Sequence, residues 1–144
     1  MIHLETITPE NWRLGLRVRA DQQRFVSDSA GILARAYAYR ENRSRAFVIY
    51  NADLPIGMAM YYDLDDLKAY NFSQFFIDQR YQGNGFGYEA AGQILQMMKN
   101  DRKYDKVVLC YIEGDDAARN LYEKLGFHHT GDADGDEIIM ELKL

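Results

Sequence analysis

The chain has 144 residues, of which 47% are hydrophobic and 13% aromatic, and its formal net charge is −5. These values exclude an intrinsically disordered chain and fit one folded domain over residues 1–144. The acidic balance, without a cluster of Lys and Arg, argues against nucleic acid as a partner and would attract a cationic substrate. Because no apolar run approaches 18 residues and no signal peptide opens the sequence, we expect a cytoplasmic protein without a membrane partner.

The residues that usually bind metals or form disulfides are sparse. Three scattered histidines and one cysteine give no metal-ligand spacing, so we expect no metal. Cys110 cannot form an internal disulfide and lies in the apolar run 107–110. We therefore expect its side chain to be a small buried hydrophobe.

The first third of the chain predicts one strand and two helices. Residues 2–7 alternate between apolar and polar side chains, as a half-buried strand does. Thr8-Pro9 resembles a helix start, and the inner face of that helix would carry Trp12, Leu16 and Ala20. A second helix is expected over residues 28–39. The aromatic residues of this region are either core or the lining of a substrate cleft, and these are Phe25, Tyr37 and Tyr39.

A hairpin and an acidic segment follow. Strands are expected over residues 46–50 and 56–62, because Asn51, Asp53 and Pro55 mark a turn between them. Residues 63–68 lack periodicity and are predicted to be a loop. Its carboxylates, Asp63 and Asp65 with Asp66, are either solvated surface groups or a patch that receives a polyvalent amine.

The most distinctive stretch is the loop after the predicted strand 71–78. Its three glycines, Gly83, Gly85 and Gly87, alternate with other residues and lead into a helix that ends near residues 101–104. Glycines allow a close backbone approach, and the first turn of a helix leaves N–H groups that a phosphate can satisfy. A tight turn without a ligand is the alternative. The spacing matches neither a Walker loop nor a dinucleotide-binding fingerprint.

The last third predicts a central strand, a short helix and a hairpin. The strand 106–112 is nearly continuous in apolar character, as expected when both faces are covered. Asp115 is a suitable N-cap for a helix over residues 117–125, and Asp134-Gly135 predicts a turn between strands 127–130 and 137–142. The helix that joins strands 71–78 and 106–112 implies that they are parallel. The fold class is therefore mixed α/β, with a mostly antiparallel sheet flanked by helices.

Two motifs together resemble the GNAT family of N-acetyltransferases. The first is the segment Gln82-Gly83-Asn84-Gly85-Phe86-Gly87, which is similar to the family's pyrophosphate loop. The second is Ala118-Arg119-Asn120-Leu121-Tyr122-Glu123-Lys124-Leu125-Gly126-Phe127, which is similar to the family's A-x-x-L-Y-x-K-x-G-F helix. The similarity spans the whole chain and implies one domain with a splayed parallel pair of central strands. Residues 57–61 and 75–83 look more narrowly like bacterial spermine/spermidine acetyltransferases.

The resemblance implies a role for each matching residue. Backbone N–H groups of the glycine loop would bind the pyrophosphate of acetyl-CoA, and the backbone of Ile77 would bind its pantetheine arm. Tyr122 would protonate the departing thiolate. The complete expected cofactor-binding set is Phe76, Ile77, Gln82, Gly83, Asn84, Gly85, Phe86, Gly87, Asp115, Asn120 and Tyr122.

The sequence indicates less clearly which residues bind and deprotonate the acceptor. An amine attacks a thioester only after losing a proton, so a base or a water path is needed. Glu113 is the first candidate for that base and Asp63 the second, while Asp63 and Asp65 are candidates for substrate binding. We expect acetyl transfer from acetyl-CoA to a small polyamine. The alternatives are acetylation of a protein, peptide or other small amine, and a non-catalytic acyl-CoA-binding module. A homodimer is one assembly that the resemblance implies.

Overall fold

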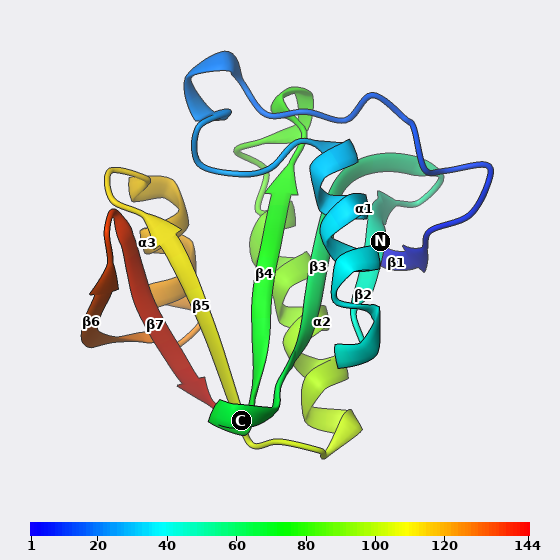
Figure 1. Ribbon diagram of the computed structural model, residues 1–144. Helices are drawn as coiled ribbons and strands as arrows, with labels where there is room; N and C mark the ends of the chain where they lie inside the picture. The colour runs from blue at the N-terminus through cyan, green and yellow to red at the C-terminus, as the bar shows by residue number, and fades with distance from the viewer.

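A single seven-stranded sheet forms the frame of the protein, shown in Figure 1 as a computed structural model that describes residues 1–144. The strand order is β1-β2-β3-β4-β5-β7-β6. All neighbouring strands are antiparallel except β4 and β5, which confirms the predicted mixed sheet with one parallel pair. The strands are β1 (Ile2–Thr6), β2 (Arg45–Asn51), β3 (Leu54–Leu64), β4 (Ala69–Ile77), β5 (Lys106–Ile112), β6 (His128–Asp134) and β7 (Glu137–Lys143).

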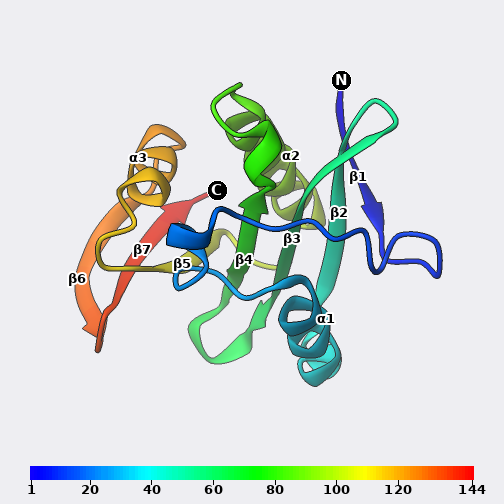
Figure 2. The same cartoon turned by 90° about the horizontal axis from the view of Figure 1, so that it is seen from above.

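Helices cover both faces of this sheet, as Figure 2 shows from above. Helix α1 (Ser29–Ala38) lies on one face, while α2 (Phe86–Asp101) and α3 (Asp116–Lys124) lie on the other. Successive residues of β3 alternate between two apolar cores: Ala59 belongs to the larger core with α2, and Met60 to the smaller core with α1. This period of two is what a strand covered on both faces requires. None of the helices has the length and apolar character needed to cross a membrane.

The helix predicted to begin at Thr8-Pro9 does not form. Gly15 has a left-handed φ of 71°, and the residues after it run in an extended path in which Leu16 and Val18 are buried. Arg17 explains the conformation, because its N–H donates to Asp78 at 2.9 Å and its carbonyl accepts from the N–H of Gln79 at 2.9 Å. The backbone groups that a helix would have used are therefore bonded to a distant segment. The short 3-10 helix η1 (Ala20–Gln22) follows.

Two further predictions need correction. Cys110 is exposed, because α1 does not extend over β5 and no helix covers that face of the strand. The acidic segment is also more ordered than a loop, since Asp63 lies in β3 and residues 65–67 form the 3-10 helix η3. The second helix, the hairpin of β2 and β3, the strand before the glycine loop and the closing hairpin are confirmed.

The sheet separates between β4 and β5. These strands are paired only at Tyr70 with Val107 and at Asn71 with Val108. Immediately beyond, β4 carries a bulge, because Met60 faces Gln74 and Tyr61 faces Phe72, which leaves Ser73 as the extra residue. A bulge bends its strand and increases its twist, so β4 turns away from β5. We call the paired side the closed end and the separated side, where β4 ends at Ile77 and β5 at Ile112, the open end (Figure 1).

Candidate active site

The glycine loop at the open end has the backbone geometry of an anion site. Gly83 and Gly85 have φ values of 83° and 80°, and a Cβ at either position would meet no atom within 4 Å. Glycine is therefore required at both positions because it adopts a positive φ without strain, and not because a side chain would clash with a neighbour. Gly85 is the N-cap of α2 and provides no side chain to bond the first-turn N–H groups. Those N–H groups and the positive end of the helix dipole remain available to a negatively charged ligand.

A buried carboxylate holds the start of this loop. Asp78 is 1% exposed and accepts hydrogen bonds from the backbone N–H groups of Arg17 and Arg80, at 2.9 and 3.0 Å. The Arg80 side chain adds an ion pair at 2.8 Å. Burial alone would raise the pKa of Asp78, but the bonds from Arg80 and Arg17 outweigh it and lower the pKa below its usual value. The side chain of Gln82 fastens the loop further, because its amide donates to the Ile77 carbonyl at 2.9 Å and to Gln22 at 3.0 Å.

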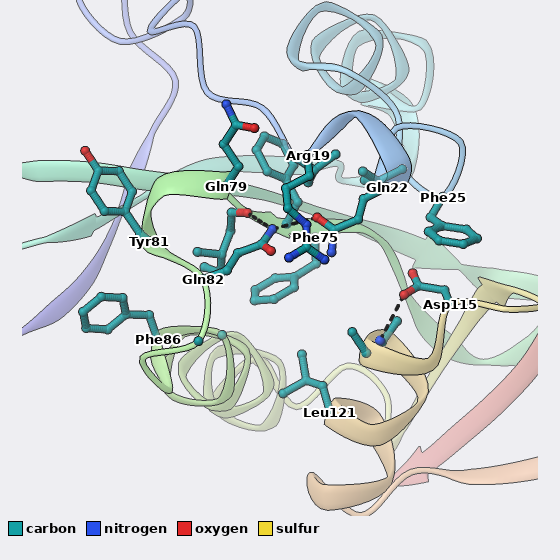
Figure 3. A pocket seen from close by; sticks show the side chains of 18 of the residues that line it. Arg19, Gln22, Phe25, Phe75, Gln79, Tyr81, Gln82, Phe86, Asp115 and Leu121 are labelled. Carbon is teal, nitrogen blue, oxygen red and sulfur yellow. Dashed lines mark hydrogen bonds between the residues drawn. The ribbon is translucent and has the colours of Figure 1, made fainter.

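The loop opens into a cavity of about 490 Å³, which we call the loop cavity. Figure 3 shows its walls: Gln82 and Phe86 come from the glycine loop and α2, Leu121 and Asp115 from the region of α3, and Gln22 from η1. The volume lies within the range of small-molecule sites, and the lining is mainly hydrophobic. A long ligand with an anionic end matches this combination of apolar walls and free N–H groups.

A second cavity of about 240 Å³ lies between the separated strands, and we call it the strand cavity. Its lining is more polar and includes Asn71 from β4, Tyr111 from β5 and Glu137 at the start of β7. Arg35 of α1 lines the same cavity. Residues common to both linings form what we call the junction, and they are Phe25, Val26, Phe75, Asp115, Ala118 and Tyr122. A ligand in one cavity would therefore lie next to a ligand in the other at the junction.

Tyr122 is a buried phenol at this junction. Its ring packs edge-on against Phe72 and Phe127, with ring centroids 6.2 and 5.7 Å away. Burial raises the pKa of the Tyr122 hydroxyl, and the negative charge of Asp115 adds to the rise. The hydroxyl therefore stays protonated through the neutral range, where it can donate a hydrogen bond or a proton.

Asp115 brings a carboxylate to the same place. Its side chain caps α3 as predicted, accepting from the Ala118 N–H at 3.2 Å. Burial raises the pKa of Asp115, the Ala118 bond opposes that rise and the charge of Asp116 adds to it. The raised pKa means that this carboxylate binds a proton more readily than an exposed aspartate does.

The structure gathers most of the predicted cofactor residues around the loop cavity, but it leaves others outside. Asn84 and Asn120 are exposed and line neither cavity. The Asn84 amide instead donates to the carbonyls of Tyr81 and Gln82, at 3.2 and 3.3 Å. The predicted residues that do line the loop cavity are Phe76, Ile77, Gln82, Gly83, Gly85, Phe86, Gly87, Asp115 and Tyr122.

The predicted acceptor residues are not brought to the junction. Glu113 is exposed at the end of β5 and lines neither cavity. Asp63 and Asp65 lie near the closed end, on the far side of the β4–β5 pairing. There Arg43 bonds Asp63 at 2.6 Å, and Lys103 contacts Asp63 and Asp65 at 2.9 and 3.4 Å. The structure thus places the candidate base Glu113 and the candidate substrate ligands Asp63 and Asp65 away from the junction.

Arg35 and Glu137 are charged residues of the strand cavity that sequence reasoning missed, and Arg19 is one of the loop cavity. Part of the position of Glu137 could have been inferred, because the predicted closing hairpin places it at the start of the last strand, opposite Asp134. Its place opposite Ile112 at the open end comes from the pairing of β7 with β5, which the hairpin does not determine. Arg35 had no such signal, since its helix reaches the cavity only through tertiary packing. Elsewhere, no three side chains of His, Cys, Asp or Glu gather in a group that could hold a metal ion.

Comparisons with known proteins agree with this geometry. The model of the acetyltransferase (GNAT) family matches residues 10–127. The chain is 27% identical to a spermine/spermidine N(1)-acetyltransferase of Bacillus subtilis, with 97% of each chain covered.

Solved structures extend the likeness to the fold. A spermidine N-acetyltransferase from Vibrio cholerae, in complex with CoA and spermine, superposes with a TM-score of 0.79 at 18% identity, covering 99% of this chain and 95% of its own. An aminoglycoside acetyltransferase in complex with coenzyme A gives 0.81 at 15% identity, with the same coverage of 99% and 95%. At these identities the structural likeness establishes the fold alone. The family match covers most of the chain, and it shows that this protein belongs to the GNAT family and is an N-acetyltransferase.

Proposed function

We propose that the protein transfers the acetyl group of acetyl-CoA to a primary amine of a small molecule, most specifically a polyamine. The observation that carries this proposal is the junction, where the loop cavity and the strand cavity share a wall containing Tyr122. In this assignment acetyl-CoA occupies the loop cavity and the amine enters the strand cavity. The two reactants then meet between the separated strands.

The loop cavity suits each part of the donor. The N–H groups around Gly83 and Gly85 would bind the pyrophosphate, because a helix N-terminus stabilises phosphate charge. The apolar walls would accommodate the pantetheine arm, which would run beside Ile77 towards the junction. Since β5 is not paired with β4 beyond Asn71, the β4 backbone there has hydrogen-bonding groups free for the amides of that arm.

The reaction at the junction is direct attack of the amine nitrogen on the thioester carbonyl. The C–N bond forms, the carbonyl oxygen takes up negative charge, and collapse breaks the C–S bond. Tyr122 donates its proton to the departing sulfur and recovers one from the nitrogen, which must lose a proton to become an amide. The enzyme needs no covalent intermediate for this sequence, so Cys110 has no required role.

Three observations support a polyamine as the acceptor. The Bacillus subtilis relative is a spermine/spermidine acetyltransferase, and the Vibrio cholerae neighbour was solved with spermine. The net charge of −5 attracts cations, and Asp115 and Glu137 place two carboxylates in the strand cavity. Arg35 lines the same cavity, so we expect the enzyme to discriminate among polyamines by the position of their second charge.

The decisive experiment measures release of free CoA thiol with acetyl-CoA and a panel of spermidine, spermine, diamines, amino acids, aminoglycosides and short peptides. We expect the highest kcat/KM with a polyamine or diamine. A preference for a peptide or an aminoglycoside would overturn the polyamine assignment while leaving the enzyme class intact. Tight binding of acetyl-CoA without turnover of any amine would indicate a non-catalytic acyl-CoA-binding module instead.

A further inference from the structure

Asp115 is a carboxylate that both cavities reach. It lines the loop cavity and the strand cavity, as Tyr122 does, and Figure 3 shows its side chain directed towards the space between α3 and Phe25. Its Oδ1 accepts the Ala118 N–H, which fixes the carboxylate to the first turn of α3. Its second oxygen, Oδ2, has no hydrogen bond from the protein, and no cation pairs with it. One oxygen is therefore held in place while the other is available to a ligand.

We propose that Asp115 is the general base that removes a proton from the acceptor ammonium group at the junction, a role that rests on the proposed acetyl transfer. Geometry selects it over the other carboxylates. Glu113 lines neither cavity, and Glu137 lines the strand cavity without reaching the loop cavity. Asp115 alone among the carboxylates lies where the amine must meet the thioester.

The proton balance is complete with the groups present. The acceptor enters as R–NH₃⁺, and Asp115 takes one proton to give the neutral amine and a carboxylic acid, which then releases that proton to solvent. After attack on the thioester, the nitrogen loses a second proton to the Tyr122 oxygen as Tyr122 protonates the sulfur. One N–H bond therefore supplies the thiol proton, and the reaction releases one net proton.

The surroundings of Asp115 suit this function. Burial raises the pKa of its carboxyl above the usual aspartate range, which makes it a stronger base. An ammonium drawn out of water beside it also loses its proton more readily, because desolvation disfavours the charged form. The other titratable or charged groups that border its two cavities, or that neighbour it on α3, are Arg19, Arg35, Tyr62, Tyr81, Cys110, Tyr111, Asp116, Tyr122 and Glu137.

The test is Asp115→Asn, because asparagine caps a helix as well as aspartate does and keeps the bond to Ala118. With saturating acetyl-CoA and the best acceptor, we expect kcat to fall by about 10²-fold or more. The affinity for CoA, measured by calorimetry, and the circular dichroism spectrum should stay unchanged. Matched controls are Glu113→Gln, with unchanged kcat, and Glu137→Gln, which should raise KM for the acceptor more than it lowers kcat.

The pH profile separates a base from a residue that only supports the structure. Wild-type kcat should be level through the neutral range and fall in acid as Asp115 becomes protonated. In the variant, kcat should rise with pH from about 6 to 9, because only the small fraction of already neutral amine reacts. A variant with wild-type kcat and weakened CoA binding would overturn the base role and assign Asp115 to the cofactor. A wild-type protein that acetylates no amine would instead overturn the proposed function.

Discussion

Asp63 and Asp101 at the closed end of the β4–β5 pair are paired with cations, whereas the carboxylates that line the strand cavity at the open end are not. At the closed end, Arg43 donates to both Asp63 and Asp101, and Tyr70 donates to Asp101 at 2.6 Å. These bonds hold the pKa of Asp101 well below its usual value, with the hydrogen bond from Arg43 as the largest cause. At the open end, Asp115 and Glu137 form no ion pair and border cavities. Carboxylates whose charge is neutralised stabilise the sheet, whereas unpaired ones remain available for a substrate.

The largest effect is expected at the open end. Tyr122→Phe removes only the hydroxyl and keeps the ring packed against Phe72 and Phe127. We expect kcat to fall by about 10² to 10³-fold, equivalent to roughly 3–4 kcal/mol in the activation free energy, because the thiolate loses its proton donor. CoA affinity and thermal stability should change little. Unchanged kcat would remove Tyr122 from the chemistry.

The corresponding change at the closed end should affect stability and spare catalysis. Asp63→Asn removes one of the two carboxylates that pair with the Arg43 guanidinium, at a site where Asp63 is 1% exposed. Because Arg43 keeps contact with solvent and with Asp101, we expect a loss of about 2–3 kcal/mol in the free energy of unfolding, below the full cost of breaking a buried pair. Urea denaturation measures it.

The control for that change is Asp65→Asn, since Asp65 is exposed and should matter much less. The kcat of folded Asp63→Asn protein should match the wild type. A large fall in kcat at saturating acceptor would show that the two ends are not independent.

A substitution in the glycine loop should weaken the binding of the cofactor. Gly85→Ala forces a side chain to adopt a φ near 80°, which costs about 1–2 kcal/mol. We expect about a tenfold weaker affinity for CoA in calorimetry, since the loop would relax away from the geometry that exposes its N–H groups. Gly92→Ala is the control: Gly92 lies inside α2 with free space around it, so alanine should stabilise the helix slightly.

The smallest effect concerns acceptor choice. Arg35→Gln removes a cation from the lining of the strand cavity, so we expect kcat/KM for spermine to rise by about three- to tenfold, roughly 0.6–1.4 kcal/mol. The rise should be smaller for a diamine and weaken with added salt. Arg40→Gln is the control, because Arg40 stacks on Tyr37 and lines neither cavity. A lower kcat/KM would show that Arg35 supports the acceptor site and does not repel the cationic acceptor.

Local patterns predicted much of the fold because they depend on neighbouring residues. The strands and the two long helices follow from periodicity and turn chemistry. The failed helix after Thr8 shows the limit, since the backbone of Arg17 is bonded to Asp78, 61 positions away. Cys110 shows another limit: apolar neighbours in sequence do not reveal whether a helix covers that face of the strand.

The residues of the candidate site also include some that the sequence could predict and others that it could not. The cofactor loop and Tyr122 lie in contiguous motifs, so their grouping could be predicted before the structure. The charged groups of the strand cavity come from α1, β7 and the start of α3, and only tertiary packing assembles them. The acidic run around Asp63 and Asp65 was conspicuous in sequence, yet Arg43 and Lys103 neutralise it. Charge content alone could not distinguish a paired cluster from a free one.

The opening between β4 and β5 separates an N-terminal part of the chain, which is synthesised first, from a C-terminal part, which is synthesised later. Residues 1–101 form β1 to β4 with α1 and α2, and residues 106–144 form β5 to β7 with α3, so each side of the opening is one continuous stretch. Both cavities take walls from both stretches. A ribosome must therefore release the second stretch before either cavity exists, and the site is completed only when two consecutive parts of the chain dock through the core around Tyr122 and Phe127.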